Sequence, residues 1–411
     1  MEDVYIVGVG MTPFGKFLDK SVKQLTRESV SQAMTDTGAR LADIESAYFS
    51  NTGQGHFEGQ LMVGGEVALR DMGFEGIPIV NTENACASAS TALYLAVQAV
   101  ASGQSEVALA VGAEKMYSKD REKMFSVFDG AWDVATPQAN YARLEALAAD
   151  FPRPGGEEES GQRSLFMDVY AFLTRYHMKN FGTTQEHLAM VASKNHYHSS
   201  LNPLSQFQNT MTVEEVMQAR EVSWPLTLPM CAPISDGSAA AIICNREALE
   251  RFDRARAIKV CASVLASGTN RKPEEHEKHL CRLAANKAYD KAGVGPEDMS
   301  LAEVHDATAF AEILQTENLG FCPIGEGGAL AASGATRLGG RIPVNVSGGL
   351  ESKGHPIGAT GLAQIYEMVL QLRGEAGERQ VEGTQFAIAE NGGGFYGIEE
   401  AAAVITILGK P

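Results

Sequence analysis

The stretch Asn84-Ala85-Cys86-Ala87-Ser88-Ala89 joins two segments of different character. Before it, Ile77-Pro78-Ile79-Val80-Asn81-Thr82 is rich in β-branched residues and predicts a strand. After it, the alanine-rich run from Ser88 to Ala101 predicts a helix. A cysteine at this junction lies at the positive end of the helix dipole, which favours thiolate over thiol. Cys86 is therefore a candidate nucleophile, and a buried structural thiol is the alternative.

Composition excludes several classes of function. The chain has 411 residues, of which 44% are hydrophobic, so it can bury a large core in two or three domain-sized units. Its net charge of −17 argues against binding to nucleic acid or to an anionic membrane surface. No run approaches the roughly 20 apolar residues of a membrane span. The six cysteines lack CxxC spacing, which predicts neither a zinc site nor a disulfide scaffold. The acidic start, Met1-Glu2-Asp3, is unlike a signal peptide, and we expect a cytoplasmic protein.

The sequence contains an internal duplication at an offset of 255 residues. The corresponding features are the helical runs Leu25–Ala33 and Leu280–Ala288, Gly38 and Gly293, Asp43 and Asp298, and the strand positions Ala47 and Ala302. Two further similarities relate Val80-Asn81 to Val344-Asn345, and Ala239–Cys244 to Ala401–Leu408. Alternating strands and helices predict parallel sheets covered on both faces. We expect an N-terminal half, residues 1–250, and a C-terminal half, residues 251–411.

The repeat pattern is interrupted between about 117 and 205. This stretch contains an acidic run, Glu157 to Glu159, and helical pieces with the aromatic residues Tyr170, Phe172 and Tyr176. Insertions in an α/β scaffold usually cover a site or an interface. We therefore expect an inserted loop domain here.

Two histidines occupy positions suited to chemistry. His305 follows the predicted strand Leu301–Val304 and precedes Asp306, and residues just past a parallel strand are where α/β proteins place their sites. His355 lies in the stretch Ser347–Gly361, where five glycines permit tight turns and close approach to a ligand. A loop histidine without a task and a glycine loop that serves packing are the alternatives.

Other candidates carry weaker signals. Asn391-Gly392-Gly393-Gly394 follows a strand-like run, and backbone N–H groups of such glycines can bind a developing oxyanion. His56 lies in a glycine-flanked turn that favours exposure over a place in a pocket. His196 and His198 have metal-like spacing but no third ligand, which predicts surface residues.

The order of these motifs resembles the thiolase superfamily over nearly the whole chain. The most specific segments are the one around Cys86, Asn345-Val-Ser-Gly-Gly349, and Gly354-His355-Pro356-Ile357-Gly358-Ala359-Thr360-Gly361. The resemblance implies an α/β thiolase fold: two duplicated βαβαβαββ halves in a five-layered αβαβα arrangement with an inserted loop domain. It also implies an acyltransferase that acts on coenzyme A thioesters, binds no other cofactor, and forms a homodimer through its N-terminal half.

Within that superfamily the chain is similar to the sterol-carrier-protein-linked thiolases and their bacterial and archaeal relatives. Those have His-Asp-Cys-Phe where this chain has His305-Asp306-Ala307-Thr308. Ordinary thiolases carry a second cysteine just before the C-terminal glycines, where this chain has Glu390-Asn391. The second catalytic thiol is thus missing from both places. The resemblance includes the benzoylsuccinyl-CoA thiolase type and implies a small partner subunit with a zinc ribbon and an OB fold.

The resemblance also implies a mechanism, a CoA-dependent retro-Claisen cleavage of a bulky, aromatic or α-substituted β-ketoacyl-CoA. Cys86 attacks the β-keto carbonyl, His355 takes the thiol proton, and an acyl-Cys86 intermediate forms. The N–H groups of Cys86 and Gly394 hold the oxyanion, and His305 holds the enolate oxygen. Asp306, Asn391 and His56 are additional candidates. The expected context is β-oxidation or aromatic degradation. The alternatives are a C-acyltransferase, with His56 as base, and a non-catalytic scaffold subunit.

Overall fold

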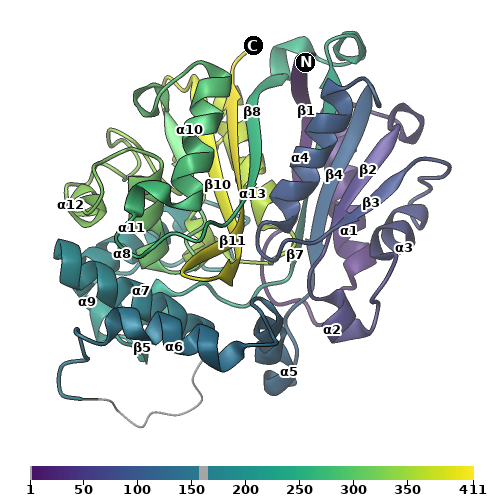
Figure 1. Ribbon diagram of the computed structural model, residues 1–411. Helices are drawn as coiled ribbons and strands as arrows, with labels where there is room; N and C mark the ends of the chain where they lie inside the picture. The colour runs from purple at the N-terminus through teal and green to yellow at the C-terminus, as the bar shows by residue number, and fades with distance from the viewer. Residues whose placement is uncertain (1, 157–164) are drawn as a thin grey trace.

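A nine-stranded mixed sheet organises the chain. The computed structural model describes residues 2–156 and 165–411, so the predicted acidic run Glu157 to Glu159 lies outside the described residues (Figure 1). The strand order is β3-β2-β4-β7-β1-β8-β11-β10-β9. In chain order the strands are β1 (Val4–Met11), β2 (Ser46–Ser50), β3 (Ile79–Thr82), β4 (Val107–Glu114), β7 (Gly237–Asn245), β8 (Ile258–Ser267), β9 (Leu301–Glu303), β10 (Phe386–Tyr396) and β11 (Glu399–Gly409).

The strand order repeats between the two halves, as the predicted duplication requires. Read outward from the centre, the first half runs β1, β7, β4, β2 and β3, and the second runs β8, β11, β10 and β9. Val344, bridged in parallel to Ala302 of β9, stands in the place of β3. The halves meet where β1 pairs with β8 through Tyr5 and Lys259 and through Ile6 and Ile258.

The expectation of parallel sheets holds only in part. β2 is parallel to β3 and β4, and β9 is parallel to β10. The other neighbouring strands of this sheet are antiparallel. The hairpin of β10 and β11, which turns at Gly397 with φ of 75°, is the clearest case.

Local structure repeats with the same offset. Helix α1 (Val22–Thr37) ends at Gly38 with φ of 74°, and α10 (Leu280–Ala292) ends at Gly293 with φ of 70°. Both glycines are left-handed caps, a conformation that costs glycine little. After each, a carboxylate caps the next turn: Asp43 accepts from Arg40 N and Asp298 from Gly295 N, each at 2.8 Å.

The register corrects one detail of the duplication. The N–H of Ala47 bonds to the carbonyl of Pro78, and the N–H of Ala302 bonds to that of Pro343, both at 2.9 Å. Pro78 therefore corresponds to Pro343, and the predicted match of Val80-Asn81 with Val344-Asn345 is off by one residue. Both segments share a polar Asn and an apolar strand residue, and sequence similarity alone could not separate the two registers.

Helices α4 (Ser88–Ala101) and α13 (Thr360–Arg373) lie between the two halves of the sheet (Figure 1). Helix α4 spans the residues predicted for it. The two helices approach closely at their N-termini, where a Cβ on Gly361 would lie 2.0 Å from Ser90 Oγ. On the outer faces, α1 and α3 (Gly64–Arg70) cover the first half, and α10 covers the second. These layers form the predicted αβαβα arrangement.

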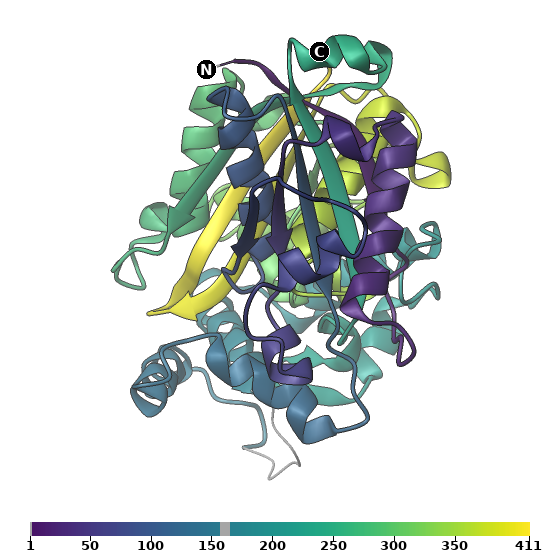
Figure 2. The ribbon, with the colours of Figure 1, turned by 90° about the vertical axis from the view of Figure 1, so that its right-hand side faces the viewer.

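The segment between β4 and β7 forms a helical unit at the end of the sheet opposite to the chain termini (Figures 1 and 2). Its elements are α5 (Arg121–Ser126), α6 (Pro137–Ala148), α7 (Leu165–Phe181), α8 (Gln185–Ser200), α9 (Val213–Gln218) and the short strands β5 (Glu221–Ser223) and β6 (Leu226–Thr227). The predicted loop domain, about 117–205, falls within this segment. Its apolar core, which includes Leu144, Tyr170 and Leu188, is continuous with Phe310 of α11 (Ala309–Asn318) and Phe395 of β10.

The remaining helices are short: α2 (Gln54–Glu58) and α12 (Gly327–Ala332). No helix in residues 2–156 and 165–411 has the length and apolar character needed to cross a bilayer. All six cysteines are described, and their thiols are free.

The strand β10 passes directly beneath the loop that carries Cys86, and Gly393 makes this possible. A Cβ at Gly393 would lie 2.2 Å from Asn84 O and 2.6 Å from Ala87 N, both backbone atoms. We predict that Gly393→Ala lowers the free energy of unfolding by about 3 kcal/mol, because rigid backbone must move to admit the methyl group. Chemical denaturation measures this effect.

The control is Gly130→Ala, because a Cβ at Gly130 meets no atom within 4 Å. This variant should differ from the parent by less than about 0.5 kcal/mol. Equal stability of the two variants would contradict the close approach of β10 to the Cys86 loop.

Candidate active site

Cys86 lies in a strained turn between β3 and α4. The residue before it, Ala85, has φ of 47°, a left-handed conformation that is uncommon outside glycine. Ser88 stabilises the turn, because its Oγ accepts from Asn84 N at 2.7 Å and donates to Ala85 O. Cys86 is half-buried, whereas the two residues after it are buried. The turn thus presents the Cys86 side chain away from the helix and toward the C-terminal half.

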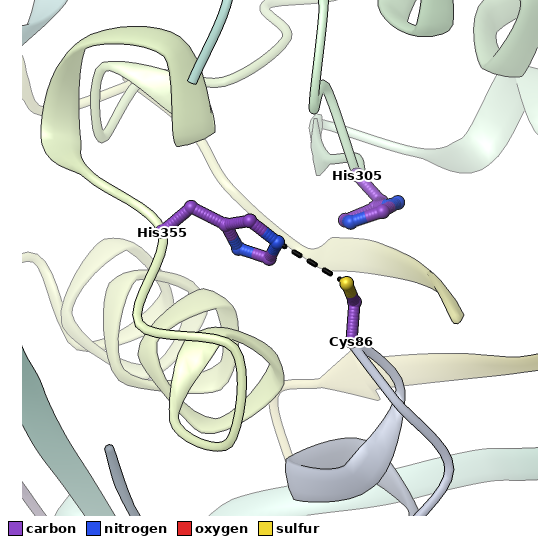
Figure 3. Close-up of side chains that lie close together, drawn as sticks. All are labelled: Cys86, His305 and His355. Carbon is purple, nitrogen blue, oxygen red and sulfur yellow. Dashed lines mark hydrogen bonds between the residues drawn. The ribbon is translucent and has the colours of Figure 1, made fainter. Parts of the chain in front are cut away.

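His355 contacts Cys86 directly, although 269 positions separate them in sequence (Figure 3). The distance from His355 Nε2 to Cys86 Sγ is 3.3 Å. On the other side of the ring, Nδ1 lies 2.7 Å from Thr360 Oγ1, and that hydroxyl donates to Pro356 O at 3.0 Å. Because the hydroxyl has one proton, it accepts from Nδ1–H. We therefore assign the Nδ1–H tautomer, which leaves Nε2 free to accept the thiol proton.

The loop that carries His355 belongs to the C-terminal half and is anchored to the N-terminal half. The backbone N–H of His355 donates to Ser235 Oγ at 2.9 Å. Further along, the N–H of Gly358 donates to Glu114 of β4 at 3.0 Å. The same buried carboxylate accepts from the N–H groups of Thr52 and Gly53, at 2.9 and 3.0 Å. Glu114 thus joins the Cys86 side of the molecule to the His355 loop.

His305 is the third member of the cluster. Its ring centroid lies 5.2 Å from that of His355 with an interplanar angle of 61°, and it points toward Cys86 (Figure 3). The backbone N–H of His305 donates to Glu390 of β10 at 2.9 Å, which fixes the end of β9. The Nε2 atom of His305 is buried and accepts or donates no hydrogen bond within the described part of the chain. A substrate oxygen can therefore bind there without displacing a protein partner.

Burial determines the protonation of all three groups. It raises the pKa of Cys86 to about 12 and lowers that of His305 to about 4. It also lowers the pKa of His355 well below its usual value, with smaller contributions from His305 and Lys353. The helix N-terminus was expected to favour thiolate over thiol, but burial raises the Cys86 pKa by more than the backbone N–H groups lower it. Desolvation outweighs the helix dipole, and at neutral pH the cluster consists of a thiol and two neutral imidazoles.

Two backbone groups oppose this effect of burial. The N–H groups of Gly394 and Cys86 point at the sulfur and lower the Cys86 pKa, but by less than burial raises it. Gly394 has φ of 62°, which turns its N–H out of the regular β10 ladder. The pair predicted as an oxyanion hole thus converges on the reacting atom. Charge that develops at or beside Sγ would be stabilised there.

The structure places two other candidates beside the cluster rather than in it. The Asp306 carboxylate accepts from Leu350 N at 2.7 Å and from Asn195 Nδ2 at 3.0 Å, and it supports the loop that leads to His355. Asn391 is buried between the central helices, where its Oδ1 accepts from Ser90 Oγ at 2.8 Å. Both residues therefore have positions suited to holding backbone and helices in place.

His56, His196 and His198 lie outside the cluster. His56 is on α2, with its Nε2 2.9 Å from the carbonyl of Lys123. His196 and His198, expected at the surface, are buried in α8. His198 Nδ1 lies 3.0 Å from Asn345 O, and its Nε2 accepts from Leu338 N at 3.0 Å. The prediction failed because these polar residues face the C-terminal half, a contact invisible in local spacing.

Sequence reasoning missed two residues that position His355, namely Thr360 and Ser235. Thr360 lies within the Gly354–Gly361 motif, five residues after His355. A polar side chain at the start of the predicted helix was the feature that could have indicated its contact with His355. Ser235 lies 120 positions away and had no such signal.

Two groups of His, Cys and Glu in the described residues have ligand atoms within 4.8 Å of one another. The first is Cys86, His305 and His355, in which His355 Nε2 contacts Cys86 Sγ. The second is His279, Cys281 and Glu400, where the Cys281 thiol donates to Glu390 at 3.4 Å. The expected absence of a metal stays a prediction.

A pH profile of Cys86 alkylation checks the protonation state. Because burial holds the Cys86 pKa near 12, the thiolate fraction should rise about tenfold per pH unit. We predict that the rate of carbamidomethylation at Cys86 rises from pH 7 to pH 10 without a plateau. Peptide mass spectrometry separates Cys86 from the other five cysteines. A plateau below pH 8 would show a resting thiolate and contradict the assignment.

Comparison with known proteins agrees with this geometry. The family model described as thiolase, N-terminal domain, matches residues 4–223, and the one described as thiolase C-terminal domain-like matches residues 269–410. An acetyl-CoA acetyltransferase of Methanothermobacter thermautotrophicus is 40% identical over 97% of this chain and 98% of its own. The benzoylsuccinyl-CoA thiolase subunit BbsB of Thauera aromatica is 34% identical over 92% and 91%.

A solved Ltp2-ChsH2(DUF35) aldolase has the same fold, with a TM-score of 0.76 at 24% identity over 99% of this chain and 98% of that one. The contact between the Cys86 thiol and the His355 imidazole thus coincides with two family models that together span most of the chain. The protein therefore belongs to the thiolase family and is an acyltransferase of acyl-CoA metabolism.

Proposed function

We propose that this protein cleaves a bulky, aromatic or α-substituted β-ketoacyl-CoA by CoA-dependent thiolysis, through an acyl-Cys86 intermediate. The observation that carries the proposal is the 3.3 Å contact between Cys86 Sγ and His355 Nε2, with the tautomer fixed by Thr360. A neutral thiol beside a neutral imidazole with a free Nε2 is ready for proton transfer as the nucleophile attacks.

In the first step His355 Nε2 takes the Cys86 proton while Sγ attacks the β-keto carbon. The carbonyl oxygen becomes an oxyanion, and the N–H groups of Cys86 and Gly394 are the donors that face it. The bond between the α- and β-carbons then breaks. Its electron pair leaves with the α-carbon as a thioester enolate, and the acyl group stays on sulfur.

The enolate needs a donor for its oxygen and a proton for its α-carbon. His305 suits the first task, because its Nε2 is buried and has no protein partner in the described residues. For the second task the chain has Ala307 where related enzymes have a thiol. The protonated His355 carries the proton taken from Cys86, and its return to the α-carbon, directly or through water, balances the step.

CoA thiol then regenerates the enzyme. Its proton passes to His355, its sulfur attacks the acyl carbon, and Cys86 leaves as a thiolate that regains the proton from His355. The products are two acyl-CoA thioesters. The same base thus serves both half-reactions, which agrees with its fixed position between Thr360 and Cys86.

Support for the substrate class and for partners comes from the relatives. The Thauera aromatica relative is named for benzoylsuccinyl-CoA, an aromatic acyl-CoA, and is named as a subunit. The similar aldolase structure joins Ltp2 to ChsH2(DUF35). We propose a homodimeric core that binds a small second subunit with a zinc ribbon and an OB fold.

Intact-mass spectrometry tests the proposed function. After incubation with a panel of β-ketoacyl-CoA substrates, we expect an acyl adduct on the wild-type chain that free CoA removes. Cys86→Ala should form no adduct and lose thiolysis by at least about 10³-fold, because the covalent route is closed. An adduct that CoA does not remove would favour transfer to another acceptor, and no adduct with any substrate would favour a non-catalytic subunit.

Thr360→Val tests the role of the tautomer. Valine keeps the shape of threonine but removes the oxygen that accepts from His355 Nδ1–H. We expect kcat for thiolysis and the rate of Cys86 alkylation to fall by about 10- to 100-fold, because the ring loses its preferred proton position. Thr35→Val, at an exposed position of α1, is the matched control. Unchanged rates in Thr360→Val would contradict this role.

A further inference from the structure

A cavity of about 50 Å³, partly open to solvent, lies between the helical unit and the β10–β11 hairpin. One wall is aromatic and aliphatic and comprises Tyr170, Leu173, Phe310, Leu314, Phe395 and Ile398. The other wall carries charged and polar groups, Arg271, His279, Glu399 and Glu400. Such a combination, apolar surface with a few polar groups at one place, is typical of a small-molecule site.

The apolar wall adjoins the active site. Phe395 directly follows Gly394, whose N–H points at the Cys86 sulfur. The ring of Tyr170 packs edge-on against Phe395, with centroids 5.4 Å apart. Burial raises the pKa of the Tyr170 phenol well above its usual value, so this part of the wall is a neutral, mostly apolar surface. The wall of the cavity thus begins one residue along β10 from the group that faces Cys86, and we take the cavity to be within reach of an acyl group on Cys86.

Most charged groups on the polar wall already have partners. Glu399 Oε1 accepts from the backbone N–H and the hydroxyl of Thr269, at 2.6 and 2.8 Å. Its Oε2 accepts from Arg271 Nε at 2.6 Å and from Leu280 N at 3.3 Å. This pair therefore holds the protein together and has little capacity left for a ligand.

Glu400 and His279 are different. Glu400 Oε1 accepts from Gln315 Nε2 at 2.9 Å, whereas the buried Oε2 accepts no hydrogen bond from the described residues. His279 Nδ1 accepts from Cys281 N and from Asn318 Nδ2, both at 3.2 Å, which places the ring proton on Nε2. That Nε2 lies 3.5 Å from Glu400 Oε2, too far for a good direct hydrogen bond.

We propose that this cavity receives the end of the acyl group remote from the thioester, and that Glu400 and His279 select acyl groups that carry a hydroxyl there. One hydroxyl satisfies both residues, because it donates to Oε2 and accepts from Nε2–H. An acyl group without it leaves a buried acceptor and a buried donor unpaired, and sites of this kind discriminate strongly against such analogues. The inference rests on the proposed function in taking Cys86 as the acylated residue.

Equilibrium binding tests the proposal without turnover. The full-length Cys86→Ala chain is titrated with benzoyl-CoA, 3-hydroxybenzoyl-CoA and 4-hydroxybenzoyl-CoA by calorimetry. At least one hydroxylated thioester should bind about tenfold more tightly than benzoyl-CoA. A second matched pair, 6-hydroxyhexanoyl-CoA and hexanoyl-CoA, asks the same question for aliphatic groups.

The Glu400→Gln substitution, added to Cys86→Ala, should reduce the preference for the hydroxyl by at least severalfold. Its amide oxygen can keep the bond to Gln315, but its NH2 group then faces the N–H of His279. Glu378→Gln, at an exposed position, is the control and should keep the preference. Binding of all five thioesters with equal affinity, or of none, would overturn the proposal.

The two proposals fail in different ways. A preference for hydroxylated thioesters without an acyl adduct on the wild-type chain would remove thiolysis and leave the cavity assignment intact. Thiolysis of β-ketoacyl-CoA substrates without a preference for the hydroxyl, in binding or in kcat/KM, would remove the assignment of Glu400 and His279 and leave the proposed function intact.

Discussion

The contact between Cys86 Sγ and His355 Nε2 is the constraint on which the rest of the structure depends. It joins two turns from opposite halves of the chain at 3.3 Å, and both turns contain uncommon backbone conformations. Ala85 is held in a left-handed conformation, and His355 follows Gly354, which has φ of 115°. Such conformations cost free energy that surrounding contacts must offset. Glu114 supplies part of this compensation by accepting hydrogen bonds from both sides of the site.

Burial sets the protonation states of Cys86 and His355. In water a cysteine beside a histidine could form a thiolate–imidazolium pair, but desolvation here raises the Cys86 pKa to about 12 and lowers the His355 pKa. The neutral forms are therefore favoured at rest, and in the proposed mechanism charge develops only as the substrate carbonyl is attacked. The N–H groups of Cys86 and Gly394, which point at the sulfur, are the donors that we propose for that charge.

Much of this could be predicted from sequence. Cys86, His305 and His355 were each identified from a predicted strand end or a glycine-rich stretch, and the resemblance to the thiolase superfamily indicated that they share one site. What sequence could not show were the long-range contacts. His198 looked like a surface residue until its partners, Asn345 and Leu338, were known. The helix dipole at Cys86 was correctly located, but its effect on pKa was overestimated because burial cannot be read from spacing.

The duplication places the proposed nucleophile and the proposed base in different halves. Helices α4 and α13 each have 14 residues, and their N-termini pack together through Gly361 and Ser90. Cys86 lies two residues before the first helix and His355 five residues before the second, so the packing of the two helix N-termini brings both turns to the same place. The two halves differ in what the first residue of each helix contacts. The first residue of α13, Thr360, orients the imidazole, whereas the first residue of α4, Ser88, closes the turn that presents the thiol.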